Sequence, residues 1–287
     1  MWVSRPNTKT NMLFLLSQDI IALYAWVDDA LPKRIVEERR GRPLLISDAE
    51  MVTILIWNIL LLKQKTWKDL HRFLLHYHAK DFPHLPKYSA FILACHRATM
   101  SSLRLLQCLL NTDAPVKILD GTMLPVCKHK RADSHRVARG IADFGKNWQG
   151  WHFGFKLHAS VDRENKLCAI AFTPANVHEK HLVPHLLGKT TRIAVADLSY
   201  GGKELRERIW KTKGTFILTT AFPGQKQKIV APWQLSLLAE RSKIESVFDY
   251  LKEHLHLVTS FPRSVFGYLA HYVMVLLGYQ VLKLCGN

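Results

Sequence analysis

The order of short apolar segments after Pro115 constrains the fold of this 287-residue chain more than any other feature. Runs of apolar and β-branched residues, which are typical of strands, alternate there with amphipathic segments of helical period. Such alternation favours an α/β fold with a sheet of mixed strand direction. The expected strands are Val116–Leu119, Trp151–Val161, Leu167–Phe172, Thr191–Ala196 and Thr215–Thr219, and the expected helices are Glu179–Leu187, Lys203–Lys213 and Leu235–His256.

Residues 1–112 have a different texture and are predicted to be almost wholly helical. Ser47 and Glu50 have the spacing of a capping box in front of the strongly apolar run Met51–Leu62. We therefore expect an all-α N-terminal domain over residues 1–112, followed by an α/β domain over residues 113–287 that ends in an apolar helix. The other helices expected in the first domain are Leu13–Val27, Trp67–Tyr77 and Tyr88–Leu110.

The charge of the chain indicates the class of its partner. Forty Lys and Arg residues against 23 Asp and Glu residues give a formal net charge of +17 at pH 7. A surplus this large favours a polyanionic partner, with nucleic acid ahead of an anionic membrane surface. The stretch Val265–Leu282 has no charged residue, but it contains His271 and Gln280 and is short for a membrane span. We interpret it as a buried C-terminal helix and expect no membrane partner.

The cysteines and the N-terminus indicate the compartment. The five cysteines form no CxxC pair, and the first residues lack the apolar region and cleavage site of a signal peptide. We therefore expect free thiols in a reducing cytoplasm.

Two aspartates and one glutamate form the candidate site. Asp120 and Asp197 each follow an apolar strand, and carboxylates at the ends of neighbouring central strands can converge. Glu245 lies on the last predicted helix in one polar stripe with Arg241 and Lys252, because the spacings are four and seven residues. We expect this helix to bring Glu245 over the two aspartates. The alternatives are a turn-forming Asp after each strand and an ordinary amphipathic helix with i,i+4 ion pairs.

Three clustered carboxylates suit divalent cations. Mg²⁺ and Mn²⁺ prefer hard oxygen ligands and bind one or two carboxylates each, together with substrate phosphate. Two such ions about 4 Å apart support in-line displacement at a phosphodiester. The sequence therefore predicts a two-ion site whose carboxylates repel one another until the ions bind. His178, after the third strand, is a further candidate for this site, with a helix cap formed by Asn176 or a plain loop histidine as the alternative.

A basic segment between Asp120 and Lys156 fits a nucleic-acid partner. Basic side chains interleaved with aromatic ones suit a DNA backbone and unstacked bases. A solvated loop with its aromatic residues in the core is the alternative. The candidate DNA contacts are Lys128, Lys130, Arg131, Arg136 and Arg139, with Lys146 and the aromatic residues Phe144, Trp148, Trp151 and Phe153 nearby.

These residues resemble the DDE triad of insertion-sequence transposases. Asp120 lies in VKILDGT, Asp197 lies in IAVADLSY, and Glu245 lies in the pattern R-x3-E-x6-K. The phrases FKLHASVD and FTPANVHE, with the helical N-terminal region, are similar to those of the insertion sequence 982 family. The resemblance covers residues 110–260 best and the N-terminal region more loosely.

The resemblance implies a ribonuclease H-like catalytic core in which Asp120, Asp197 and Glu245 bind two Mg²⁺ or Mn²⁺ ions. Arg241 and Lys252 would contact the DNA backbone of the transposon ends, directed at phosphate instead of at Glu245. The implied activity is that of a DNA transposase, which binds terminal inverted repeats, cleaves the ends and joins them to target DNA. Coupling two ends implies at least a homodimer, and the family implies a cytoplasmic protein of the bacterial nucleoid.

Two departures from the family pattern leave alternatives open. Leu238 occupies the Tyr position of Y-x2-R-x3-E-x6-K, and DLSY replaces DKGY, so that Leu198 and Ser199 stand where Lys and Gly are expected. One alternative is a catalytically inactive copy that acts as a DNA-binding protein or repressor. Another is a nuclease of the same fold that only hydrolyses DNA. It also stays open whether the N-terminal bundle reads bases or only dimerises.

Overall fold

The computed structural model describes residues 20–32, 44–147, 150–220 and 231–285. Within the predictions above, Trp148 and the first part of the predicted helix Leu13–Val27 lie outside the described residues.

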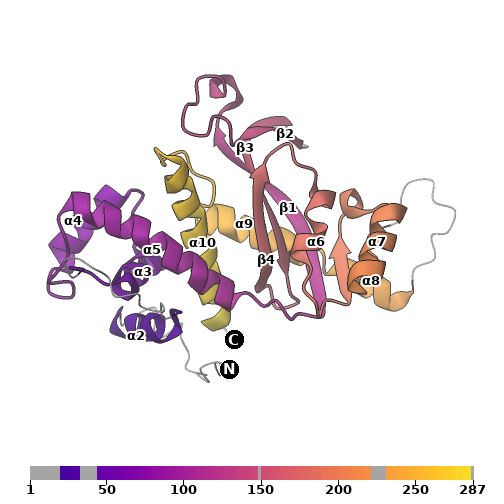
Figure 1. Ribbon diagram of the computed structural model, residues 1–287, viewed down its shortest axis with the longest axis horizontal. Helices are drawn as coiled ribbons and strands as arrows, with labels where there is room; N and C mark the ends of the chain where they lie inside the picture. The colour runs from indigo at the N-terminus through magenta and orange to yellow at the C-terminus, as the bar shows by residue number, and fades with distance from the viewer. Residues whose placement is uncertain (1–19, 33–43, 148–149, 221–230, 286–287) are drawn as a thin grey trace. The chain divides into compact units, whose positions relative to one another are not determined.

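The chain forms two compact units (Figure 1). One consists of Met1–Leu109 with Phe261–Asn287, and the other consists of Leu110–Ser260. The sequence placed residues 113–287 in one domain, whereas in the structure the C-terminal segment belongs with the N-terminal residues.

A six-stranded mixed sheet forms the centre of the unit Leu110–Ser260, and it confirms the predicted α/β fold class. β1 runs antiparallel to β3 and parallel to β5, and β5 pairs in parallel with β6. β2 and β4 both run antiparallel to β3, β2 along Gly150–Gly154 and β4 along Phe155–Val161. The strands are β1 (Val116–Cys127), β2 (Asp143–Asn147), β3 (Gly150–Val161), β4 (Leu167–Pro174), β5 (Ile193–Ala196) and β6 (Phe216–Leu218).

β1 is longer than the sequence predicted. The expected strand ended at Leu119 before a turn at Asp120, but β1 continues to Cys127 with Asp120 inside it. The strand continues because β3 pairs with it as far as Cys127. A Cβ at Gly121, inside this strand, would lie 3.3 Å from the Glu179 Cγ atom and close to two further side chains. The glycine therefore serves a close approach of side chains to the strand, and it does not mark a turn.

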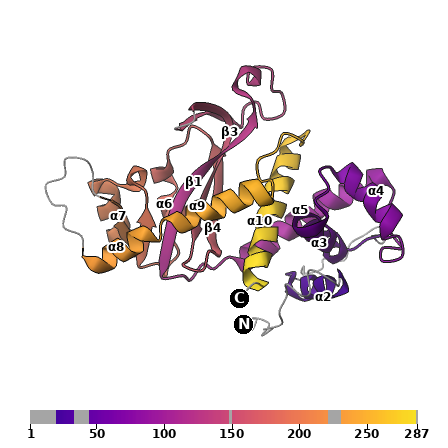
Figure 2. The same cartoon turned by 180° about the vertical axis from the view of Figure 1, so that it is seen from behind.

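Helices cover both faces of the sheet. On one face, α6 (Val183–Leu186) and α7 (Lys203–Lys213) share an apolar core with β1, β5 and β6. α9 (Ser242–Asp249) packs against β1, and it lies behind the sheet in Figure 1 and in front of it in Figure 2. The core under α6 and α7 includes Leu119, Val183, Leu186, Ala194, Ala196, Tyr200 and Ile209.

Short 3-10 turns replace part of the predicted helix Glu179–Leu187. The turn η3 (Glu179–His181) is followed by α6, and Pro184 lies in the first turn of α6, where a proline is tolerated. A second 3-10 turn, η4 (Leu198–Tyr200), follows β5 directly after Asp197.

The helix predicted over Leu235–His256 is divided into three pieces. These are α8 (Pro232–Ala239), α9 and the π turn η5 (Tyr250–His254). Between α8 and α9 the backbone N–H groups of Glu240 and Arg241 each donate to the carbonyl three residues earlier, at 3.1 Å. Four apolar residues of this segment, Ile244, Phe248, Leu251 and Leu255, are buried.

Every regular element that the structure describes in the other unit is helical. The predicted capping box is present before α3, since Ser47 Oγ accepts the Glu50 N–H at 3.0 Å and the Glu50 carboxylate accepts the Ser47 N–H at 2.7 Å. The elements are α2 (Ile20–Ala30), α3 (Asp48–Trp57), the π turn η1 (Asn58–Leu62), α4 (Trp67–Tyr77), α5 (Tyr88–Leu109) and α10 (Val265–Cys285).

Within the described ranges, α10 is the one helix that is long and apolar enough to cross a bilayer. It packs against α5 and α3, and 67% of its apolar window is buried inside the protein. A Cβ at Gly278 would lie 2.8 Å from the Ile59 Cγ2 atom, and Gln280 Nε2 donates to the Leu109 carbonyl at 2.7 Å. The prediction of a buried helix is confirmed, and no membrane protein is indicated.

Candidate functional site

Neighbouring parallel strands carry the two candidate aspartates. Leu119 of β1 is paired with Ala196 of β5, and Asp120 and Asp197 are the next residues along each chain. β5 ends at this point, and Asp197 leads into η4, where the Tyr200 N–H donates to the Asp197 carbonyl at 3.0 Å. The two aspartates therefore lie beside each other where β1 extends beyond the end of β5.

The charge environment of Asp120 groups it with the other predicted residues. Burial raises the pKa of the Asp120 carboxyl from 3.8 to about 6. The Gly121 N–H, which donates to Asp120 Oδ1 at 2.8 Å, and the Arg241 cation both act to lower this pKa. The negative charges of Asp197 and Glu245 act to raise it. Three carboxylates and one guanidinium are thus close enough to influence one protonation equilibrium.

Glu245 reaches the site from α9. The neighbouring Ile244, Val247 and Phe248 are buried, whereas the Glu245 side chain is 48% exposed. Its Oε1 atom forms an ion pair of 2.8 Å with Arg241 Nη2. In this structure Arg241 is therefore directed at Glu245, because the i,i+4 spacing places the two side chains together, and its contact with DNA phosphate stays a prediction.

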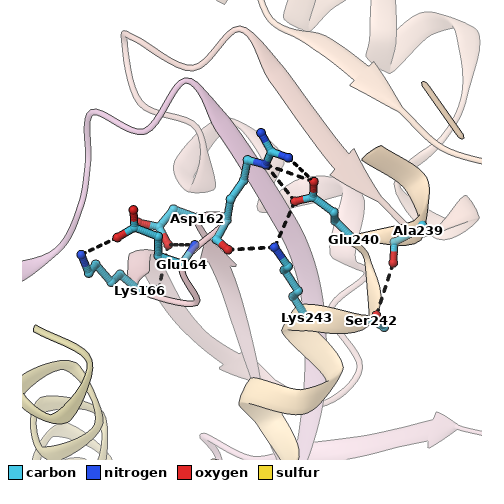
Figure 3. Close-up of polar contacts among 8 residues, drawn as sticks. Asp162, Glu164, Lys166, Ala239, Glu240, Ser242 and Lys243 are labelled. Atoms are coloured by element: carbon cyan, nitrogen blue, oxygen red, sulfur yellow. Dashed lines mark hydrogen bonds and ion pairs between the residues drawn. The ribbon is translucent and has the colours of Figure 1, made fainter. Parts of the chain in front are cut away.

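The start of α9 is attached to the turn between β3 and β4 (Figure 3). The Arg163 Nε atom donates to both oxygens of Glu240, at 3.1 and 3.0 Å. Lys243 Nζ donates to Glu240 at 3.2 Å and to the Arg163 carbonyl at 2.8 Å, as the dashed lines show. These bonds join residues about 80 positions apart at the break between α8 and α9. They fix the place from which Arg241 and Glu245 project.

Lys252 lies on η5 and is also near the site. Burial lowers the pKa of its ammonium group, and the nearby carboxylates of Asp249, Glu253 and Asp120 act in the opposite direction. The effect of Asp120 shows that this lysine is within electrostatic range of the acidic group, although the π turn changes the helical spacing from which it was predicted.

The carboxylate ligands of the site suit a divalent ion, but in this structure their side chains are not oriented to bind one ion together. Carboxylate oxygens are the ligands that Mg²⁺ and Mn²⁺ prefer. Burial raises the pKa of Asp120, the charges of Asp197 and Glu245 raise it further, and a bound cation would favour the ionised carboxylate. Among the residues that the structure describes, no three His, Cys, Asp or Glu side chains are arranged to hold a metal ion together. Glu245 would have to exchange Arg241 for the ion.

A buried polar cluster beside Gly121 was not predicted. Lys156 Nζ donates to Glu179 Oε1 at 2.7 Å and to the Val177 carbonyl at 3.0 Å, and the lysine side chain is only 8% exposed. His158 Nε2 is 2.9 Å from Thr173 Oγ1, and burial, with the Lys156 charge, lowers the pKa of the imidazole to about 4. The alternation in FKLHASVD, which puts Lys156 and His158 on one face of a buried strand, was the available signal.

His178 lies beside this cluster, because its Nδ1 atom is 3.7 Å from Glu179 Oε2. Its side chain is 51% exposed, and its Nδ1 atom accepts the Lys180 N–H at 3.3 Å at the start of η3. The predicted alternative assigned a helix cap to Asn176, whereas in the structure His178 is the N-cap of η3. The next residue, Glu179, lies beside β1.

The basic segment presents exposed cations and one exposed tryptophan. Phe144 and Phe153 contact each other at 5.1 Å between ring centroids and Phe153 is buried, so the core alternative holds for this pair. Trp151 is 56% exposed, and Lys146 Nζ lies 6.0 Å from the centre of its ring. Trp151 also lines a cavity of about 390 Å³ with Lys128, His129 and His152. The predicted contacts Lys128, Lys130, Arg131, Arg136 and Arg139 are all exposed.

Residues 111–265 match the family described as Transposase DDE domain, which is more than half of the chain. The matched range contains all six strands, α9 and the three candidate carboxylates. No curated protein matches the chain.

Proposed function

The chain belongs to the DDE transposase family, and we propose that it is an active DNA transposase of the insertion sequence 982 type. It would bind the terminal inverted repeats of its element, cleave the DNA at these ends and join the freed 3′-hydroxyl groups to target DNA. The observation that carries this proposal is the position of Asp120 and Asp197 on adjacent strands, with Glu245 within electrostatic range.

The acidic residues would serve as ligands for two Mg²⁺ or Mn²⁺ ions. When bound, such ions activate the attacking hydroxyl and stabilise the leaving oxygen of an in-line displacement. Asp120 would be positioned by the backbone of β1, and Asp197 by its place between β5 and η4. Glu245 would join them from α9 after leaving Arg241. Hydrolysis and joining would share the site, since both reactions are attacks on a phosphodiester.

The cations around the triad would bind the DNA backbone. Once Glu245 turns to the acidic group, the Arg241 guanidinium is free to donate two parallel hydrogen bonds to a phosphate. Lys252 is partly buried near Asp120 and would act there as a point charge. Both residues would hold the scissile strand next to the carboxylates.

A ribonuclease H-like core is part of the proposal. In its support, β4, β3 and β1 are joined in antiparallel order, and β5 and β6 continue the sheet parallel to β1. The exposed cations at 128–139 and Trp151 would extend the DNA surface beyond the triad. The helical region 1–112 would contribute to end binding or to a working dimer.

One reaction separates the proposal from its two alternatives. The full chain is incubated with Mg²⁺, a plasmid target and labelled duplexes taken from the DNA that flanks its coding sequence. A transposase cuts at the repeat ends and yields joined products. Cut ends without joined products would identify a nuclease, and binding without cleavage would identify an inactive repressor. Either result contradicts the proposal.

A further inference from the structure

Tyr200 is a buried residue whose hydroxyl group has no hydrogen-bond partner in the described part of the chain. The side chain is 0% exposed. A buried tyrosine hydroxyl normally has a partner, and an unsatisfied one lowers stability. An unsatisfied polar group that persists in a core therefore calls for a functional explanation.

Tyr200 packs against the residues that precede the two aspartates. It ends the 3-10 turn η4, which begins directly after Asp197. Its ring belongs to the same apolar cluster as Leu119 and Ala196, the residues that precede Asp120 and Asp197. β1 continues beyond this pair whereas β5 ends there, and Tyr200 lies three residues after Asp197 in η4.

Carboxylates are the charged groups that act on the Tyr200 hydroxyl. Burial raises its pKa, and the negative charges of Asp120, Glu179 and Asp197 raise it further, so the phenol keeps its proton and remains a donor. η3 and η4 contact each other, which brings Glu179 toward Tyr200. Of these three carboxylates, Glu179 already accepts a hydrogen bond from Lys156. Asp120 and Asp197 are therefore the better candidates to accept a hydrogen bond from the Tyr200 hydroxyl.

We propose that Tyr200 is a positioning residue whose hydroxyl donates a hydrogen bond to the Asp120–Asp197 pair, directly or through one bound water, when these carboxylates bind their divalent ion. The bond would orient these carboxylates when they bind their divalent ion. This inference rests on the proposed function, because it assigns Tyr200 to the same metal site.

The test uses Tyr200→Phe, which removes the hydroxyl and keeps the ring in its apolar cluster. Two properties of the full chain are measured without DNA: the thermal midpoint in EDTA, and the Kd for Mn²⁺ alone. Cleavage of the flanking-DNA duplex is then measured against Mn²⁺ concentration. Tyr272→Phe, which removes another buried tyrosine hydroxyl in the unit that contains α10, is the matched control.

The inference predicts an unchanged or higher thermal midpoint for Tyr200→Phe, since an unsatisfied hydroxyl is removed. It predicts an Mn²⁺ Kd about tenfold weaker and a cleavage curve shifted to higher Mn²⁺, whereas Tyr272→Phe leaves both unchanged. An Mn²⁺ Kd equal to that of the parent would overturn it. A lower thermal midpoint would also overturn it, because the hydroxyl would then serve the fold.

Asp197→Asn, measured in parallel, separates the two proposals. If Asp197→Asn abolishes cleavage while Tyr200→Phe changes neither Kd nor cleavage, only the inference about Tyr200 fails. If Asp197→Asn cleaves as well as the parent, the proposed function itself fails.

Discussion

Arg241 and Glu245 form an ion pair of 2.8 Å across one turn at the start of α9. The positive charge of the same guanidinium also acts to lower the pKa of Asp120, so Arg241 interacts with both Glu245 and Asp120. Arg241 therefore offsets part of the negative charge of the acidic group. In the proposed reaction, a divalent ion takes over Glu245 and Arg241 moves to a DNA phosphate.

This relationship predicts that Arg241→Ala weakens DNA binding more than it weakens folding. Both side chains are partly exposed, at 34% and 48%, so the pair contributes less than about 1 kcal/mol to the free energy of unfolding. Loss of a phosphate contact should lower the salt dependence of DNA-end binding by about one counterion. Urea denaturation and fluorescence anisotropy at several salt concentrations measure the two effects.

Lys203→Ala is the matched control. Lys203 forms an i,i+4 pair with Glu207 on α7, and its substitution removes the same charge. It should leave the salt dependence unchanged. Equal effects of the two substitutions would mean that only net charge matters and that Arg241 contacts no phosphate.

The raised pKa of Asp120 predicts a specific pH dependence of stability without metal. The folded-state pKa of about 6 lies above the ordinary value of 3.8, so the folded protein binds more protons between these values. The contribution of Asp120 to the free energy of unfolding is therefore fully present below pH 3.8 and is lost as pH rises through 6. Asp120→Asn removes this loss and should be more stable than the parent at pH 7.5, by about 1–3 kcal/mol.

Chemical denaturation in EDTA at pH 3.5 and 7.5 measures this difference. At pH 3.5 the two proteins should have similar free energies of unfolding, since Asp120 is then protonated in the folded parent and mostly protonated in the unfolded parent. A destabilised Asp120→Asn protein at pH 7.5 would show that the carboxylate is satisfied in the metal-free fold.

Trp151 provides a prediction about single-stranded DNA. An exposed aromatic ring that lies near Lys146 and lines a cavity can stack on an unpaired base. Trp151→Ala should weaken binding of a single-stranded oligonucleotide by about 1 kcal/mol, roughly fivefold, without changing its salt dependence. Trp210→Ala on α7 is the control, because that ring is 59% exposed and lies outside the basic segment. An equal loss with both variants would contradict a stacking role for Trp151.

The triad could be proposed from the sequence because each acid follows or interrupts a strong local pattern. Apolar strands precede Asp120 and Asp197. The buried residues Ile244 and Phe248, which flank Glu245 on α9, can be recognised from the local sequence of that helix. The parallel pairing of β1 with β5 then makes the two aspartates neighbours, which strand order alone did not require.

Contacts between distant residues determined what the sequence did not reveal. The break between α8 and α9 is fixed by Arg163 and Glu240, which are 77 positions apart. β2 reads DFGKN, which has no alternation of apolar residues, and it forms because β3 offers a free edge segment at Gly150–Gly154. The burial of Lys156 depends on Glu179, 23 residues later, and the unsatisfied hydroxyl of Tyr200 depends on how η4 packs.

Asp197→Asn tests the central claim most directly, with Asp113→Asn as a control for the same loss of charge at an exposed position before β1. Cleavage of the flanking-DNA duplex is measured in Mg²⁺ for the parent and both variants. The account predicts a loss of at least about 100-fold for Asp197→Asn, with DNA binding retained, and no change for Asp113→Asn. Cleavage by Asp197→Asn at the parental rate would contradict it.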